Sequence, residues 1–244
     1  MPDFLSRPGL PSLAYAKREG AGPTIVFLPG YGSDMEGSKA IALDAWAEAQ
    51  GQVMLRLDYR GCGQSEGAFG DATLDDWRDD VLDLIDTLTE GPVILVGSSM
   101  GGWLMLLIAL ERPERVAALV GIAAAPDFTD WGYDEVQRAT IENDGLIAVE
   151  HPDYDTPEIT TRIFLHSGQA NLLLDREIPI DCPVRLLHGL DDTDVPPSIA
   201  FRLGRALRSA DVQTMLVKGG EHRLSRPGDL ALLLTTVGAL IETL

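Results

Sequence analysis

The feature that most constrains this chain is a strand–turn–helix pattern at residues 91–102. An apolar run leads into the sequence Gly-Ser-Ser-Met-Gly at residues 97–101, and an apolar helical pattern follows directly. A Gly-x-Ser-x-Gly sequence in this setting is typical of a sharp turn that lifts a serine side chain clear of the backbone. Gly97 and Gly101 lie two positions either side of Ser99, where a β-carbon would crowd the turn. The pattern therefore makes Ser99 a candidate nucleophile.

The rest of the chain alternates short apolar runs with longer helical patterns. This alternation predicts an α/β fold, with a mostly parallel central sheet and helices on both faces. At 244 residues the chain is long enough to bury a substantial core, and we interpret residues 1–244 as a single domain. The expected strands are 24–28, 53–57, 93–96, 116–122, 184–188 and 212–217. The expected helices are 39–50, 73–89, 99–111, 198–209 and 229–242.

The alternation stops at approximately residues 127–178, where prolines and glycines interrupt weak helical patterns and no clear strand is visible. We interpret this segment as a small helical cap inserted into the domain. It carries 12 acidic residues against 3 arginines. A solvated helical face accounts for this charge, and a lid that disfavours anionic ligands is the alternative.

Composition excludes several function classes. A net charge of −19 argues against binding to nucleic acid or to anionic membrane surfaces, since both are bound through clustered Lys and Arg. No apolar run reaches the ~18 residues that cross a bilayer, so we expect no stable membrane insertion. Cys62 and Cys182 lack metal-ligand spacing and are expected to be free thiols, without a metal site. The first eight residues show no secretory or organellar address, and a cytoplasmic location is the expectation.

A serine nucleophile needs a base and an acid that orients the base. In sites built on this kind of turn, the chain order is Ser, then acid, then His. Of the four histidines, His222 alone lies beyond the last expected strand, in a glycine-containing loop, and it is the candidate base. Three aspartates follow strand 184–188, namely Asp191, Asp192 and Asp194, and each is a candidate acid on position alone.

Two backbone N–H groups are expected to stabilise the negative charge that develops during nucleophilic attack. One belongs to Met100, directly after the nucleophile, and the other to Tyr31, in the loop after strand 24–28. An apolar substrate pocket needs a lining. The candidates are Trp103, Leu104, Phe128, Trp131 and Phe164, for which core packing is the alternative interpretation.

Three segments, at residues 58–65, 97–101 and 188–192, together resemble the α/β-hydrolase superfamily over essentially the whole chain. The superfamily spacing His-Gly-x-x-Asp-x-x-Val-Pro selects Asp192 as the acid and leaves Asp191 and Asp194 as solvated or helix-capping residues. A narrower likeness is to the family of the mitochondrial α/β-hydrolase domain-containing protein ten, and it is carried by residues 29–31, 37–40, 77–81, 91–106 and 182–189. That resemblance implies hydrolysis of S-palmitoyl thioesters and of acyl glucuronides by Ser99, Asp192 and His222.

The residues and the resemblance together predict a cofactor-free serine hydrolase. It would cleave carboxylic ester or thioester bonds of a small-molecule or acylated substrate through an acyl-enzyme on Ser99. A general carboxylesterase or lipase, or a peptidase, would use the same three residues. A non-catalytic ligand-binding protein of the same fold is the alternative from another class, and the complete Ser, Asp and His set argues against it.

Overall fold

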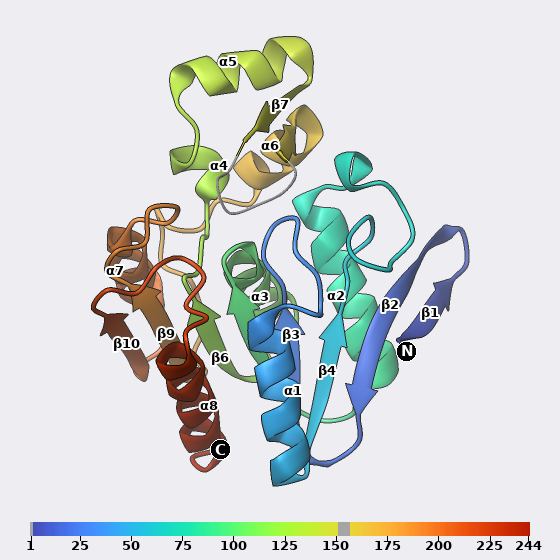
Figure 1. Cartoon of the computed structure of the whole chain (residues 1–244), viewed down its shortest axis with the longest axis vertical. Helices are drawn as coiled ribbons and strands as arrows, with labels where there is room; N and C mark the ends of the chain where they lie inside the picture. The colour runs from blue at the N-terminus through green and yellow to red at the C-terminus, as the bar shows by residue number, and fades with distance from the viewer. Residues whose placement is uncertain (1, 151–156) are drawn as a thin grey trace.

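An eight-stranded sheet forms the centre of the molecule (Figure 1). The computed structural model describes residues 2–150 and 157–244. The strand order is β1-β2-β4-β3-β5-β6-β9-β10, in which β1 and β2 run antiparallel to their neighbours and the other pairs are parallel. The bounds are β1 (Asp3–Arg7), β2 (Leu10–Arg18), β3 (Ala21–Leu28), β4 (Gln52–Leu57), β5 (Val93–Ser98), β6 (Val116–Ile122), β9 (Val184–Gly189) and β10 (Val212–Val217).

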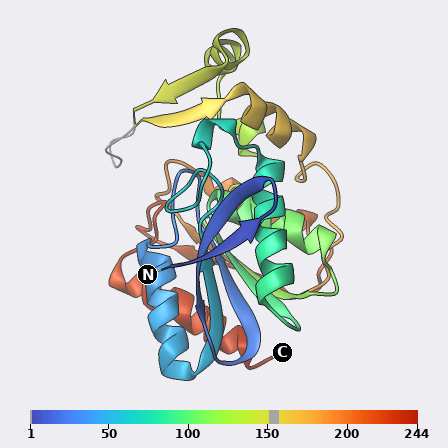
Figure 2. The ribbon, with the colours of Figure 1, turned by 90° about the vertical axis from the view of Figure 1, so that its right-hand side faces the viewer.

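Helices cover both faces of the sheet, as Figure 2 shows from the side. One core lies between the sheet and α1 (Ser38–Gln50) with α8 (Pro227–Ile241). The other lies between the sheet and α2 (Leu74–Leu88), α3 (Met100–Glu111) and α7 (Pro197–Ala206). A short 3₁₀ turn, η1 (Phe69–Asp71), precedes α2. The prediction of a mostly parallel sheet between two helical layers is therefore confirmed.

The helix α2 illustrates how sequence sets an element. The Thr73 side chain accepts the Asp76 N–H, and the Asp76 carboxylate accepts the Thr73 N–H in return, so that two otherwise unpaired donors are satisfied at the helix start. The residues that α2 buries recur at intervals of three and four, and they include Trp77, Val81 and Leu84. This stripe packs on the sheet. Asp80 is buried as well, where it pairs with Arg7 and Arg60, and the other acidic residues of α2 are at least partly exposed.

The first two strands of the chain, β1 at the edge of the sheet and β2 beside it, lie outside the strands expected from sequence. β1 is largely exposed, and it lacks the apolar run that marks the central strands. Long-range contacts hold it instead. The Arg7 guanidinium bonds both Asp80 and Asp83 of α2, at 2.7 and 2.9 Å. The five residues of β1 alone give no indication of a contact with residues so far away in the sequence.

The turn between β5 and α3 is as sharp as the sequence indicates. Ser99 adopts a φ of 53°, in the left-handed region that side chains rarely enter, and α3 begins one residue later at Met100. A β-carbon on Gly97 would overlap the backbone of Gly101, and one on Gly101 would overlap the Leu28 carbonyl of β3. Only glycine therefore fits at either position.

The segment between β6 and β9 lies over the carboxyl ends of the parallel strands (Figures 1 and 2). It contains α4 (Phe128–Trp131), α5 (Glu135–Asp144), β7 (Leu146–Val149), β8 (Glu158–Thr161) and α6 (Arg162–Ala170), and its residues 151–156 lie outside the described residues. β7 and β8 pair antiparallel, which corrects the expectation that this segment has no strand. Each has four residues, too few for an alternating pattern to be recognised in sequence.

Asp127 joins the two ends of this segment. It is buried, with a φ of 61°, and its carboxylate accepts the backbone N–H groups of Leu173 and Leu174 at 2.9 and 2.7 Å. Burial raises the pKa of Asp127, and the hydrogen bonds oppose that shift. One carboxylate thus ties the start of this segment, just after β6, to its end, before the chain continues to β9.

The sharp turn between β5 and α3 yields a prediction about stability. Gly97→Ala places a β-carbon into backbone that has no room for it, so we expect the free energy of unfolding to fall by about 3 kcal/mol or more. Gly204→Ala in α7 is the matched control, because its β-carbon would meet no atom closer than 3.6 Å. We expect that variant to gain about 0.5–1 kcal/mol. Urea unfolding of both variants measures the difference, and equal midpoints would contradict the assignment.

Candidate active site

Ser99, His222 and Asp192 lie in one hydrogen-bonded line at the carboxyl end of the sheet. The Ser99 Oγ and His222 Nε2 atoms are 3.1 Å apart, and His222 Nδ1 lies 2.9 Å from Asp192 Oδ2. Ser99 follows β5, Asp192 follows β9 and His222 follows β10, so three strand ends converge here. When His222 Nδ1–H donates its hydrogen bond to the Asp192 carboxylate, Nε2 carries no proton and is free to accept the serine proton.

Asp192 is buried and strongly hydrogen-bonded. Its Oδ1 accepts the N–H groups of Asp194 and Val195 at 3.0 and 2.8 Å, while Oδ2 faces His222. Burial raises the pKa of Asp192, but the hydrogen bonds and charge of His222, together with the two backbone donors, outweigh burial and hold the pKa below its usual value. The group is therefore a carboxylate at neutral pH and stabilises a charged imidazole.

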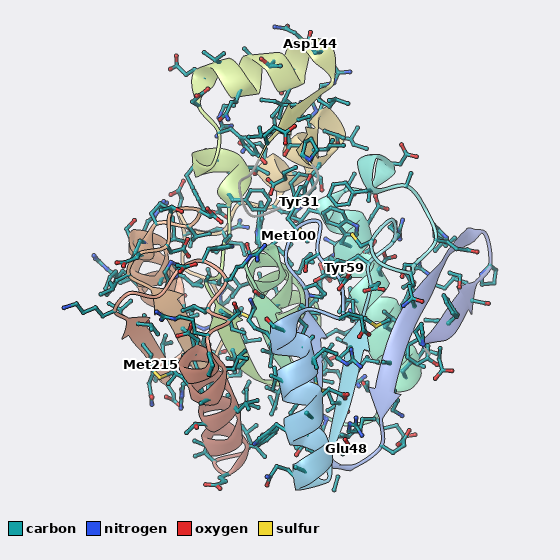
Figure 3. The ribbon with its side chains drawn as sticks, in the orientation of Figure 1. Tyr31, Glu48, Tyr59, Met100, Asp144 and Met215 are labelled. Carbon is teal, nitrogen blue, oxygen red and sulfur yellow. The ribbon has the colours of Figure 1, made fainter. Side chains whose placement is uncertain are left out.

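Met100 and Tyr31 flank the serine, and Figure 3 shows both at this end of the sheet. Met100 is the first residue of α3, where an N–H has no carbonyl partner within the helix. The loop that carries Tyr31 lies against the serine, because a β-carbon on Gly30 would stand 3.4 Å from that of Ser99. The Tyr31 hydroxyl donates to the Ile159 carbonyl at 2.7 Å, which connects this loop to β8.

A pocket of about 470 Å³ opens at Ser99 and His222. Phe128, Trp131 and Tyr133 form an aromatic wall on one side. Polar residues from other loops and from the start of α1 also line the pocket, and they include Ser33, Asp34, Ser38, Lys39, Arg223 and Ser225. The pocket therefore offers an apolar surface and a hydrogen-bonding surface to the two halves of a substrate.

The structure divides the five residues expected to line this pocket. Phe128 and Trp131 do line it. Trp103, Leu104 and Phe164 are instead buried in the core beneath it. Trp103 and Leu104 lie on α3, whose first turns pack against the sheet, and Phe164 fills the space between Tyr31 and Trp77, at ring-centroid distances of 4.8 and 5.4 Å.

Tyr133 and Lys39 are among the lining residues that the sequence analysis did not select. The Lys39 ammonium donates to the Arg223 carbonyl at 2.6 Å and thereby connects α1 to the loop of His222. Burial, and secondarily the charge of Arg223, lower the pKa of Lys39 to about 8. The lysine opens a predicted helix, and position at a helix start gives no sign of a pocket. Within the described ranges, no group of three His, Cys, Asp or Glu side chains could hold a metal ion.

Comparison with known proteins identifies the family. Residues 23–144 match the family described as alpha/beta hydrolase fold. Palmitoyl-protein thioesterase ABHD10 of Homo sapiens is 40% identical over 247 residues, which cover 99% of this chain and 80% of that protein. The chain belongs to the α/β-hydrolase family.

Solved structures agree with this α/β-hydrolase assignment. Mouse alpha/beta hydrolase domain-containing protein 10 superposes with a TM-score of 0.93 at 39% identity, covering 100% of this chain and 99% of the mouse chain. A crystal structure from Agrobacterium vitis S4 gives a TM-score of 0.92 at 36% identity, covering 99% and 98%. The predicted resemblance is confirmed, and so is the prediction that this α/β-hydrolase is an enzyme.

The expectation of a cytoplasmic location is wrong. The human, bovine and mouse relatives of this α/β-hydrolase are all named as mitochondrial proteins. The expectation depended on seeing no secretory or organellar address in the first eight residues, and that observation does not establish a compartment. Separately, none of the helices in the described part of the chain has the length and apolar character needed to span a bilayer.

The pKa of Lys39 predicts a pH dependence of stability. Between pH 8 and 10.5 the unfolded chain keeps a proton on this lysine that the folded protein has lost, so the wild type gains stability as pH rises through this window. Lys39→Met lacks this gain, and Lys218→Met, which removes an exposed lysine, is the control. Urea unfolding midpoints at intervals between pH 7 and 11 measure this gain in stability. Parallel curves for wild type and Lys39→Met would contradict the shift.

Proposed function

We propose that this protein is a serine hydrolase that cleaves ester or thioester bonds through an acyl-enzyme on Ser99. The observation that carries the proposal is the 3.1 Å contact between the Ser99 hydroxyl and His222 Nε2, backed by the 2.9 Å contact from His222 Nδ1 to Asp192. A serine hydroxyl is a weak nucleophile until a base takes its proton, and this contact places the base within hydrogen-bonding reach.

In the first step, His222 Nε2 takes the Ser99 proton as Oγ attacks the carbonyl carbon. The carbonyl oxygen becomes an anion, and the N–H groups of Tyr31 and Met100 stabilise it. Asp192 stabilises the imidazolium that forms on His222. Collapse of the tetrahedral intermediate breaks the bond to the alcohol or thiol, which leaves with the proton from His222.

In the second step, water replaces the leaving group. His222 takes one proton of the water as its oxygen attacks the acyl carbon, and the same two N–H groups hold the second oxyanion. Collapse releases the carboxylic acid, and His222 returns its proton to Ser99 Oγ. The cycle needs no electron acceptor, metal or cofactor, because every proton moves through one imidazole.

The pocket supports an acyl substrate with a polar leaving group. The acyl chain lies along the aromatic wall of Phe128, Trp131 and Tyr133, and the leaving group lies toward the polar side. In this proposal residues 1–244 act as one domain, with residues 127–178 as its cap. The relatives named palmitoyl-protein thioesterase support a long-chain acyl thioester as the substrate class.

The first test concerns the nucleophile. Ser99→Ala removes the attacking oxygen, so we expect kcat to fall by roughly 10⁴-fold or more and labelling by a fluorophosphonate to disappear. Ser98→Ala is the matched control, because it alters the adjacent serine of the same turn and is expected to keep the label. Labelling is read by mass spectrometry and turnover with p-nitrophenyl esters. Near-normal turnover by Ser99→Ala would refute the proposed function.

The second test concerns the aromatic wall. Trp131→Ala removes a ring that lines the pocket, so we expect kcat/KM to fall by about tenfold for long acyl chains and to change little for acetyl esters. Val136→Ala, on the exposed side of α5, is the control. A chain-length series of p-nitrophenyl esters and acyl thioesters measures the preference. Equal losses on all chain lengths would show that Trp131 does not contact the acyl group.

A further inference from the structure

A second histidine, His188, lies against the acid of the site. It is the penultimate residue of β9 and is 1% exposed. Its Nε2 atom stands 2.9 Å from the Val195 carbonyl oxygen. A carbonyl only accepts hydrogen bonds, so Nε2 of His188 carries a proton and donates it. The sequence analysis assigned this histidine no role.

The same nitrogen faces Asp192. It lies 3.4 Å from Oδ2, the oxygen that His222 Nδ1 contacts at 2.9 Å. The His188 N–H is therefore shared between a carbonyl at normal hydrogen-bond distance and a carboxylate oxygen slightly beyond it. Both side chains are almost wholly buried, with 1% and 0% of their surface exposed, so this dipole acts on the carboxylate with little solvent screening.

We propose that His188 is a positioning residue that tunes the base through Asp192. It ties the turn carrying Asp192 to β9 through Val195, and its N–H dipole draws electron density from Oδ2, which weakens the pull of Asp192 on the protonated form of His222. This inference rests on the proposed function, in which His222 must be unprotonated to activate Ser99.

The direction of the effect follows from charge. Without the His188 N–H, the negative charge of Oδ2 faces His222 alone, and the imidazolium becomes more stable. His222 then loses its proton only at a higher pH, and the fraction of enzyme with an active base at neutral pH falls. A residue that only packed β9 against its neighbours would change stability without changing this pH dependence.

The titratable groups around His188 are the same in the two variants that are compared below. Its partner in β10 is Leu216, and the buried residue of α7 nearest in sequence is Ile199, neither of which titrates. The other charged or titratable side chains on the two loops that meet here are Asp191, Asp192, Asp194, Lys218, Glu221, His222, Arg223 and Arg226. All of them remain in both variants described next, so their effects cancel.

Substituting His188 by amides of two different lengths distinguishes its role as a hydrogen-bond donor from a role in packing. Glutamine carries its amide nitrogen as many bonds from Cα as His188 Nε2, whereas asparagine ends one bond short. We expect His188→Gln to keep kcat/KM within about threefold. We expect His188→Asn to raise the midpoint of the acidic limb of its pH–rate profile by about one unit, which lowers kcat/KM by about tenfold at pH values on that limb. Identical midpoints in the two variants would overturn the proposal.

A measurement on the wild type does not depend on variants that fold. Histidine labelled with ¹⁵N in the full chain reports which ring nitrogen of His188 carries the proton. Protonated Nε2 throughout pH 6–9 is expected, and an unprotonated Nε2 would overturn the proposal. If the wild type hydrolyses no ester or thioester, the proposed function fails by itself. The contact between His188 and Asp192 is then still tested by the NMR chemical shift of the His222 Nδ1–H proton. We expect that chemical shift to change in His188→Asn and to remain unchanged in His188→Gln.

Discussion

The close packing of β5 on α3 is the contact on which the site depends. Gly97 lies against Gly101, and Gly101 lies against the carbonyl of Leu28 at the end of β3. This single point of contact fixes the serine turn and the loop that carries Tyr31 relative to each other. Ser99 is held at a φ of 53°, a strained conformation that the buried strand and helix on either side sustain. Preorganisation of the site is thus a result of backbone packing.

Much of this fold was predictable because its central elements are self-contained patterns. The central parallel strands are buried on both faces and appear in sequence as short apolar runs, and α2 carries both a start signal and an apolar stripe. The edge strand β1 depends on Arg7 reaching two carboxylates of α2, which no local pattern encodes. Elements held by distant contacts were the ones that sequence did not predict.

The site shows the same division. Ser99 and His222 stood out by motif and by position, whereas three neighbouring aspartates were equivalent until a family spacing separated them. In the structure Asp192 is distinguished by its Oδ1, which accepts two N–H groups of its own turn. The residues that line the pocket were harder to predict, because apolar residues close to a nucleophile in sequence occur both in the core and in the pocket wall. Trp103 and Trp131 are the same residue type, but Trp103 lies on α3, which packs against the sheet, and Trp131 lies on α4, over the ends of the strands.

The contact of Asp127 with Leu173 and Leu174 makes the segment between β6 and β9, which covers the site, unusually independent of the sheet. The two ends of the segment between β6 and β9 meet at this contact, so the length and sequence of the segment do not alter the path of the central strands. The residues proposed to carry out hydrolysis, Ser99, Asp192 and His222, all lie on the sheet side, after β5, β9 and β10. A lineage of such proteins is therefore free to exchange one cover for another and acquire new substrates while its chemistry is inherited unchanged.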